Sequence, residues 1–397
     1  MLDYRQSLGV IEELKSIKKG YENIFLTQAN GRVLYEDIVA AVDSPEFLTA
    51  AMDGYAIKFE QMEQVLKIAC DNPAGAGAPT LVGLDSCIKT FTGALMPQGS
   101  DTLVPIENVE VIDGTIKVNQ KVPRGFATRE VGETYRKGEV LISKGTQLGF
   151  AEIGVMASLN MAYVKVLQKP KVAIISSGSE ILDIAQLQTN PSQIRSSNHI
   201  ALEVLAQNMG VEVLQAGVVN DDKQNLTQSI ENALNSCDIV VTTGGVSVGD
   251  YDFTKEVIQK LGARVLFHGV KIKPGQHLLL AQIGNKFILS LPGFAYSAMV
   301  TFILYMQPLL QKFGYRNQQR LIKARMMENF KSFEGKTRFV AVNLDCVAGD
   351  YQVDLEGKKG GSSAILTNML DGAALLAIEE EKSEIQKGEM VSVLLVQ

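Results

Sequence analysis

Residues 238 to 245 read Asp238-Ile239-Val240-Val241-Thr242-Thr243-Gly244-Gly245, an apolar, β-branched run that ends in two glycines. A run of this kind, bounded by turn residues, is typical of a strand buried on both faces of a parallel sheet. Similar runs lie at Val172 to Ser176 and Val213 to Val219, and helical patterns lie at residues 199–209, 224–236 and 254–261. The alternation predicts a doubly wound α/β sheet domain, which binds its ligand outside the carboxyl ends of the strands.

The regions around this domain have other patterns. The chain has 397 residues, and a single core stops growing near roughly 250 to 300 residues, so an α/β multidomain protein is expected. Residues 43–122 consist of short apolar runs broken by Gly and Pro, which predicts a small β-rich domain. Residues 318–397 alternate as strands do and predict a C-terminal β domain. We assign residues 1–42 plus 123–165 to an elongated N-terminal linker and dimerisation domain of helix and strand, which leaves 166–317 for the α/β domain.

One apolar stretch is long enough to require a membrane test. Residues 287–310 contain no charged residue. Pro292-Gly293 interrupt the stretch, and Pro308 is expected to end the helix that follows after about 14 residues, which is typical of a buried core helix. The first 20 residues have the pattern of an amphipathic helix and not of a signal peptide. We therefore expect no membrane partner and a cytoplasmic location.

Charge and cysteine usage restrict the ligands. The 44 acidic residues exceed the 38 basic ones, giving a net charge of −6, and no basic block is present, so no nucleic-acid partner is expected. The four cysteines are far apart and form no CxxC pair, so neither a zinc site nor a disulfide framework is predicted. An anionic ligand must therefore be bound by local groups.

A glycine-rich turn directly follows the strand at residues 238–243. Its glycines allow backbone N–H groups to approach a phosphate, and nearby carboxylates commonly hold Mg²⁺. The candidate phosphate-binding residues are Gly244, Gly245, Ser247, Gly249 and Asp250, and Asp252 is the candidate metal ligand. The alternative is a tight turn that binds nothing.

Three further polar loops are expected at the same edge of the sheet. They contain Ser177, Gly178 and Glu180; Ser197 and Asn198; and Asp221 and Asp222. The first two sets have an alternative role in capping a helix, because Glu, Ser and Asn are capping residues. Four polar loops at one sheet edge favour a ligand site more strongly than any one of them alone.

Two more groups are candidates for binding anions or for catalysis. Lys271 and Lys273, followed by Pro274 and Gly275, lie two apart in an extended segment, so both ammonium groups point the same way. Two like charges together indicate an oxyanion between them, and the alternative is a solvated strand face. In the small β-rich domain, Asp53 and Thr92 precede glycines and, taken alone, are ordinary turn residues.

As a set, these motifs resemble the MoeA and gephyrin E-domain family of molybdopterin molybdenumtransferases. The matching stretches are Ala51–Ala56, Phe91–Ala94, Gly132-Glu133, Ser177–Leu182, Ser197-Asn198, Asp221-Asp222, Gly244–Asp252 and Lys273–Gly275. They occur in the family order, and the flanking segments fit the family length. The resemblance therefore covers essentially the whole chain.

The resemblance implies a homodimer of four-domain subunits. Each active site would lie between the sheet domain of one subunit and the small β domain of the other. The implied reaction inserts molybdate into adenylated molybdopterin with Mg²⁺ and releases AMP. Asp53, Thr92, Glu180 and Asp252 would be catalytic, and Asp221, Asp222 and Asp252 would bind metal. Ser177, Gly178, Ser197, Asn198, the glycine loop and the Lys271–Gly275 segment would bind substrate. Molybdopterin adenylyltransferase and molybdoenzyme apoproteins would be partners.

The chain departs from the family pattern at several places. The residues that differ are Leu48, Thr134, Gln276, Phe294 to Tyr296, and Lys359. Two alternative functions therefore remain open from the residues alone. One is a catalytically weakened pterin-binding scaffold, and the other is a pterin or nucleotide pyrophosphatase on the same fold.

Overall fold

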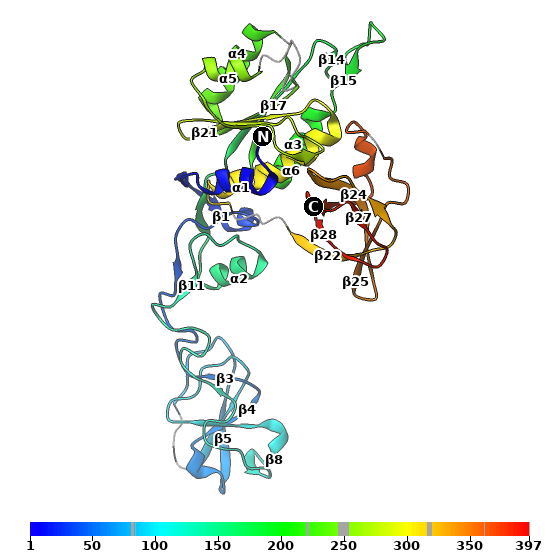
Figure 1. Ribbon diagram of the computed structural model, residues 1–397. Helices are drawn as coiled ribbons and strands as arrows, with labels where there is room; N and C mark the ends of the chain where they lie inside the picture. Colours follow the sequence, from blue (N-terminus) through cyan, green and yellow to red (C-terminus); the bar gives the residue numbers. More distant parts are fainter. Residues whose placement is uncertain are drawn as a thin grey trace. The chain divides into compact units, whose positions relative to one another are not determined.

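The computed structural model describes residues 1–80, 83, 85–219, 222–244, 254–315, 320–360 and 362–396. The chain forms two compact units. The large unit contains residues 1–24, 29–35 and 165–397, and the small unit contains residues 25–28 and 36–164. Three six-stranded sheets organise the chain, two in the large unit and one in the small unit (Figure 1).

The central sheet of the large unit confirms the predicted doubly wound α/β domain. Its strand order is β16 (Glu212–Val219), β13 (Lys171–Ser177), β17 (Ile239–Thr243), β21 (Lys286–Leu291), β20 (Leu279–Ile283) and β18 (Arg264–His268). The first four strands are parallel, whereas β20 pairs antiparallel with both β21 and β18, two pairings that the sequence did not predict. The parallel strands end at one sheet edge, where the polar loops begin.

Helices cover both faces of this sheet. On one face α3 (Asn198–Asn208) and α6 (Ala295–Gln311) lie side by side in one core with residues of α1 (Tyr4–Glu12) (Figure 1). On the other face α4 (Lys223–Ser236) and α5 (Thr254–Lys260) contribute to a second core. The buried strands therefore have apolar side chains on both sides, as expected for a parallel sheet.

Helix α6 corrects one prediction. Pro308 does not end the helix, which continues to Gln311. A proline removes one helical hydrogen bond, but Leu309 and Leu310 are completely buried, and packing of these side chains continues the helix. The expectation of a buried core helix is confirmed. Within the part of the chain that the structure describes, no helix has both the length and the apolar character needed to cross a bilayer.

The second sheet of the large unit is mostly C-terminal. Its order is β19 (Ile272–Lys273), β24 (Thr337–Val347), β25 (Asp350–Asp354), β22 (Leu321–Met326), β28 (Met390–Leu394) and β26 (Ala374–Ile378), and β24 also pairs with β26. Strand β19 comes from the sequence range of the α/β domain and pairs parallel with β24. In this register Lys273 is the partner of Arg338. A two-residue strand thus brings two cations together.

The small unit contains the third sheet. Its order is β7 (Thr102–Pro105), β4 (Gly54–Ile57), β6 (Ser86–Thr90), β5 (Val65–Asn72), β9 (Thr115–Val118) and β8 (Val109–Ile112). Side chains such as Ile57, Leu66 and Cys87 form its core. The expected apolar run at residues 81–84 lies largely outside the described residues. The sheet lies within the predicted range 43–122, although the boundaries of the domains stay a prediction.

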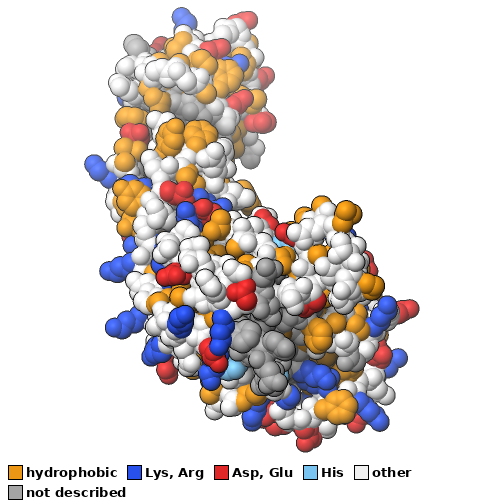
Figure 2. Space-filling view, turned by 90° about the horizontal axis from the view of Figure 1, so that it is seen from above, with side chains coloured by type: hydrophobic (Ala, Val, Ile, Leu, Met, Phe, Trp, Pro, Cys, Tyr) orange, Lys and Arg blue, Asp and Glu red, His pale blue; other side chains and the backbone are white. Residues whose placement is uncertain are grey.

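Short elements complete the fold. Helix α1 ends at Glu12, so Leu14 and Ile17 lie beyond it despite their helical spacing. Among the described residues, the remaining α-helix is α2 (Phe150–Ser158), and there are four short 3-10 helices. The remaining strand pairs are β1 (Tyr21–Phe25) with β12 (Tyr163–Leu167), β2 (Ile38–Val39) with β11 (Val140–Ile142), β3 (Thr49–Ala50) with β10 (Thr128–Arg129), β14 (Ile181–Leu182) with β15 (Ile194–Arg195), and β23 (Phe330–Lys331) with β27 (Glu384–Ile385). On the face shown in Figure 2, basic and acidic side chains of the described residues are interspersed.

Candidate active site

The turns after β13 and β17 meet at the carboxyl edge of the central sheet. The hydroxyl groups of Ser176 and Thr243 form a hydrogen bond of 2.9 Å between these strands. Gly244 follows with φ of +93°, and a Cβ atom there would lie 2.3 Å from the carbonyl oxygen of Ser177. Only glycine fits this crossing. The backbone of the predicted phosphate loop therefore begins directly beside Ser177.

The structure tests only the beginning of that loop. Gly245, Ser247, Gly249, Asp250 and Asp252 lie outside the described residues, as does Asp221. The hydroxyl group of Ser177 is buried and has no hydrogen-bond partner among the residues that the structure describes. A buried, unpartnered hydroxyl costs free energy unless another group satisfies it. Ser177 is therefore a polar group available at this edge.

The segment after β13 carries Glu180. No helix begins at this residue, which lies in a turn before β14, so the helix-capping alternative is wrong for Glu180. Its carboxylate lies against Gly178, because a Cβ atom on Gly178 would be 2.9 Å from Oε2 of Glu180. The carbonyl oxygen of Glu180 accepts a hydrogen bond of 2.8 Å from the backbone of Ile194. Glu180 is thus fixed through its backbone, at the same sheet edge as Ser177.

The loop before α3 places Asn198 at this edge as well. Ser197 is the N-cap residue of α3, but its side chain forms no capping hydrogen bond. The side-chain amide of Asn198 donates a hydrogen bond of 2.8 Å to the carbonyl oxygen of Gly293, in the turn after β21. Gly293 in turn lies close to Gly244, because a Cβ atom on Gly293 would be 3.7 Å from Cα of Gly244. Residues from three loops are therefore brought together.

Asp222 has a structural role. Its side chain accepts a hydrogen bond of 2.9 Å from the backbone of Asn225 and caps helix α4, and its second oxygen accepts one from the Asn225 side chain. This N-cap role was not predicted from the sequence, although Asp is a common N-cap residue. Among the described residues, no group of three or more His, Cys, Asp or Glu side chains could hold a metal ion. Binding of metal by Asp222 stays a prediction.

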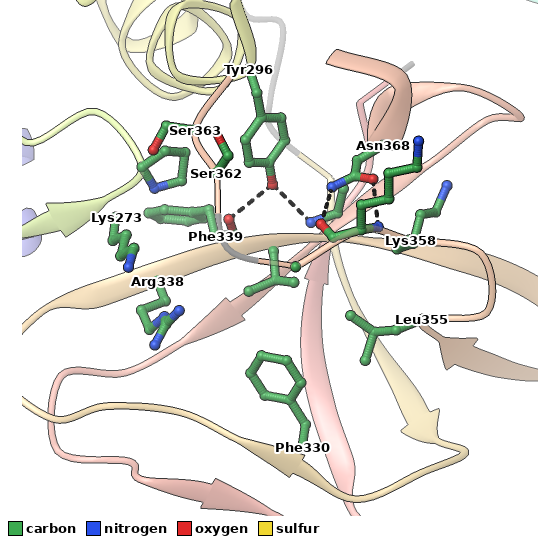
Figure 3. A pocket seen from close by; sticks show the side chains of 15 residues that line it. Lys273, Tyr296, Phe330, Arg338, Phe339, Leu355, Lys358, Ser362, Ser363 and Asn368 are labelled. Atoms are coloured by element: carbon green, nitrogen blue, oxygen red, sulfur yellow. Dashed lines mark hydrogen bonds between the residues drawn. The ribbon is translucent and has the colours of Figure 1, made fainter. Parts of the chain in front are cut away.

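A cavity of about 180 Å³ lies where the start of α6 meets the C-terminal sheet (Figure 3). Lys273 and Arg338 lie on the same side of it. Ser362 and Ser363 lie near the start of α6, and Lys359 also lines the cavity. Pro274, Tyr296, Phe330 and Leu355 contribute to the lining as well. Since Lys358 lines it too, the cavity combines four cations with hydroxyl groups and an apolar wall.

Arg338 is the most informative of these side chains. Its Nε and Nη1 atoms are buried, and neither has a hydrogen-bond partner in the described part of the chain. Burial lowers the pKa of its guanidinium group below the usual value. Its guanidinium carbon lies 5.2 Å from the centre of the Phe333 ring. Since a guanidinium presents its N–H groups as a fork that matches an oxyanion, the cavity has the properties of an anion site.

The two predicted lysines do not share this cavity. The ammonium group of Lys271 lies 3.2 Å from the carboxylate of Glu380, and Lys271 does not line the cavity. The anion had been predicted because Lys271 and Lys273 would otherwise repel each other. The carboxylate of Glu380 already balances the charge of Lys271, so this reason no longer holds. Gly275 has φ of +94°, and a Cβ atom there would lie 2.1 Å from Cγ2 of Thr301, so glycine is required where this turn meets α6.

Sequence reasoning missed Arg338, Ser362 and Ser363. Arg338 is a charged residue at the start of an otherwise apolar strand run, Phe339 to Val342, and that contrast was the available signal. The two serines follow Gly360-Gly361, a pattern typical of an anion-binding turn. Neither signal identifies a partner, because β19 and β24 meet only in the folded chain.

In the small unit, Asp53 and Thr92 form a direct pair. The backbone N–H and the hydroxyl of Thr92 donate hydrogen bonds of 2.8 and 2.6 Å to the same carboxylate oxygen of Asp53. The hydroxyl bond, then the backbone bond, lower the pKa of Asp53, and nearby Lys89 adds to this effect. The exposed carboxylate is therefore held ionised and oriented. The structure thus joins two residues that lie far apart in the sequence.

Known protein families match the chain along nearly its whole length. Residues 2–160 match the MoeA N-terminal region (domain I and II), residues 173–312 a probable molybdopterin binding domain, and residues 323–396 the MoeA C-terminal region (domain IV). The chain is 30% identical to a molybdopterin molybdenumtransferase of Haemophilus influenzae, with 94% of this chain and 93% of that protein covered. It is 31% identical to one from a Nostoc species, covering 94% and 88%.

Solved structures agree with these matches. A molybdopterin biosynthesis MoeA protein from Pyrococcus horikoshii OT3 superposes with a TM-score of 0.84 at 31% identity, with 100% of both chains covered. The similarity extends over the whole length of the chain. The chain therefore belongs to the MoeA family of molybdopterin molybdenumtransferases, enzymes of molybdenum cofactor biosynthesis.

Proposed function

We propose that this enzyme inserts molybdate into adenylated molybdopterin in a Mg²⁺-dependent reaction that releases AMP. The observation that carries the proposal is the cavity beside Lys273 and Arg338. Molybdate is a tetrahedral dianion, and it is bound best by cations and hydroxyl groups that are already in place. Lys273 and Arg338 offer the charge, and Ser362 and Ser363 offer hydroxyl groups.

The sheet edge would bind the phosphates of the substrate. Ser177 offers an unpartnered hydroxyl there, and Gly244 begins a glycine-rich turn. Asn198 reaches the turn that leads into α6, and Tyr296 near the start of α6 lines the cavity. The phosphate and molybdate sites would therefore be adjacent, as the transfer of molybdate to the pterin requires.

A divalent cation would neutralise charge on the departing AMP. We assign this ion to Asp221 and Asp252, both of which lie outside the described residues. Asp222 would contribute only if it exchanged its bonds with Asn225 for the metal, because one of its oxygens caps α4 and the other accepts from the Asn225 side chain. We therefore rank Asp221 above Asp222 as the ligand.

We further propose that the enzyme is a homodimer in which Asp53 and Thr92 complete the partner's site. Exposed apolar side chains in the small unit support an interface. The rings of Phe25 and Tyr163 pack edge to face at 5.7 Å and are 46% and 58% exposed. Val39 pairs with Val140 across β2 and β11, and both are about half exposed. Phe150, at the start of α2, is 91% exposed.

The proposal also defines partners by their chemistry. A molybdopterin adenylyltransferase would supply the substrate, and molybdoenzyme apoproteins would take the product. Both follow from the proposed reaction, because its substrate carries an activated phosphate and its product is a finished cofactor.

The decisive experiment supplies adenylated molybdopterin to the purified enzyme with and without molybdate and Mg²⁺, and measures AMP. We expect AMP release to require both. Lys273→Ala should raise the molybdate concentration for half-maximal release about tenfold, the effect of losing one charged contact of roughly 1.4 kcal/mol. Lys271→Ala is the matched control, because Lys271 pairs with Glu380 outside the cavity.

The possible outcomes separate the alternatives. AMP release that does not depend on molybdate would identify a pyrophosphatase. Binding of the pterin without any AMP release would identify a scaffold. Equal molybdate responses of the two lysine variants would remove the cavity from the reaction.

A further inference from the structure

Phe294 is a large apolar side chain in an unusual place. It is 63% exposed, and it lies between Gly293, which the Asn198 amide contacts, and the first residues of α6. It is the N-cap residue of α6 but contributes no capping hydrogen bond. Its side chain therefore has no structural role as a cap, and exposure of a phenyl ring to water is unfavourable.

The surroundings of Phe294 are the two polar sites described above. On one side, Gly293 lies next to Gly244 at the phosphate-binding edge. On the other side, the backbone of Ser297 donates a hydrogen bond of 3.2 Å to the carbonyl oxygen of Ser363, which lines the anion cavity. Since consecutive Cα atoms are about 3.8 Å apart, Phe294 lies within a few residues of both. In the chain, it thus lies between a residue at the proposed phosphate site and a residue bonded to the lining of the anion cavity.

The ring of Tyr296, two residues further along the chain, is not available to a ligand. Tyr296 is 7% exposed, and its hydroxyl donates to the carbonyl oxygen of Phe339 and accepts from the backbone of Ala341 (Figure 3). In the described parts of the turns after β13, β17 and β21, Phe294 is the exposed aromatic residue. A flat ring bound at this edge would therefore contact Phe294.

We propose that Phe294 is a stacking contact for a flat nitrogen heterocycle of the substrate. Aromatic side chains bind such rings through their faces, without hydrogen bonds and without strong ring specificity. The inference rests on the proposed function, which supplies two such rings, the pterin and the adenine. It adds a binding residue that the phosphate loops and the cation cavity do not include.

The composition of the chain allows a direct test. It contains no tryptophan, so Phe294→Trp introduces the single one. We expect AMP, a 6-substituted pterin, or both to quench its fluorescence, and the ligand that does so identifies the ring. Tyr351→Trp is the matched control, because Tyr351 is 44% exposed on β25 and lines neither site. Its fluorescence should not respond.

Two further variants separate stacking from bulk. Phe294→Leu keeps an apolar side chain and should weaken binding of the responding ring about tenfold, equivalent to roughly 1.4 kcal/mol. Phe294→Tyr keeps the ring and should bind as the wild type does. Equal affinities of the Leu variant and the wild type would overturn the proposal. So would a change in oligomeric state with ring affinity unchanged, because Phe294 would then be a protein contact.

Failure of the proposed function has a different signature. Molybdate is not aromatic, so its effect on AMP release should be the same in the wild type and in Phe294→Tyr. If the wild type binds the ring normally but releases no AMP in response to molybdate, the proposed reaction is contradicted and the role of Phe294 stands. If the wild type releases AMP in response to molybdate but Phe294→Leu binds the ring as tightly as the wild type, the role of Phe294 is contradicted and the proposed reaction stands.

Discussion

Arg338 and Lys271 show how a neighbouring carboxylate decides whether a cation is available to a ligand. Lys271 lies 3.2 Å from Glu380, so its charge is already paired. Two buried nitrogens of Arg338 have no partner among the described residues. A buried donor without a partner costs free energy in the folded protein, and an anion that accepts from it recovers that cost. We therefore expect Arg338 to lower the stability of the ligand-free protein and to strengthen the binding of an anion.

Thermal unfolding measures both effects. Molybdate at about 100 times its Kd should stabilise the wild type by roughly 2.7 kcal/mol, because it binds the folded state alone. Arg338→Met keeps an apolar stem of similar length, so the ligand-free variant should be at least as stable as the wild type. Its melting temperature should no longer respond to molybdate. A variant that is markedly less stable without ligand would show that Arg338 has a structural partner instead.

The pair of Asp53 and Thr92 predicts a specific titration. Because the Thr92 hydroxyl bond is the largest cause of the lowered pKa of Asp53, Thr92→Val should raise that pKa towards its usual value. A lowered folded-state pKa means that the pair stabilises the fold above the pKa of the unfolded chain. This contribution is lost as pH falls through the folded-state pKa. Carboxyl NMR titration of Asp53 in both proteins measures the shift, and an unchanged pKa would contradict it.

The pairs Asp53–Thr92 and Lys273–Arg338 also show which site residues could be found from the sequence. Asp53 and Thr92 are ordinary turn residues taken alone, and they could be found because the motifs around them match the family pattern. Arg338 could not be found, because its role depends on its register partner Lys273. Lys273 lies 65 residues earlier in the sequence and meets Arg338 only in the folded chain. A charged residue in a strand is usually a solvated one. Only the fold identifies the exception.

At the scale of elements, burial decided which predictions were right. The strands β13 and β17 were predicted well because each is a continuous apolar run buried in the sheet, whereas β16 is an edge strand whose residues are exposed or half-buried. Strand β19 has only two residues and gives no periodic signal. Helix α6 runs past Pro308 because tertiary packing outweighed the local preference. Short strands and packed prolines are therefore where the sequence pattern was insufficient.

One histidine fixes the segment that carries Glu180 and Asn198. The side chain of His199 is 3% exposed, and its ring lies 2.6 Å from the Ser196 hydroxyl and 3.0 Å from the Asp183 carboxylate. Asp183 follows β14, and Ser196 follows β15. A carboxylate only accepts, so Nε2 carries a proton and, in the neutral ring, Nδ1 accepts from Ser196. The ring thus closes the base of the loop between Asp183 and Ser196.

We predict that His199→Leu destabilises the protein by about 1 to 3 kcal/mol, because it leaves a buried hydroxyl and a carboxylate without their partner. His199→Asn is the matched variant, since an amide oxygen near the position of Nδ1 can still accept from Ser196, and its loss should be smaller. Urea unfolding measures both. Hydrogen exchange should also accelerate at the amides of Ile194 and Ser196, which donate to the carbonyl oxygens of Glu180 and Leu182. Unchanged exchange in His199→Leu would contradict the role of the ring.

At the scale of the whole molecule, the candidate residues form two sets that lie in different compact units. Asp53 and Thr92 belong to the small unit, and Ser177, Glu180 and Lys273 belong to the large unit. The family resemblance implies that the two sets meet across a homodimer. In a closed C2 dimer each of the two sites would take its large-unit residues from one chain and its small-unit residues from the other.

This arrangement predicts complementation between two inactive variants, Asp53→Ala and Asp252→Ala. In a mixed dimer one site would carry both substitutions and the other would carry neither. Random subunit exchange makes about half of the dimers mixed, so AMP release should recover to about a quarter of the wild-type value per subunit. Each variant taken alone through the same exchange procedure is the control and should stay inactive. Subunit exchange must be shown independently, for example with differently tagged chains, because slow exchange also gives no recovery. If the subunits exchange and activity stays absent, Asp53 and Asp252 act within one chain, and the small unit then completes the site of its own subunit.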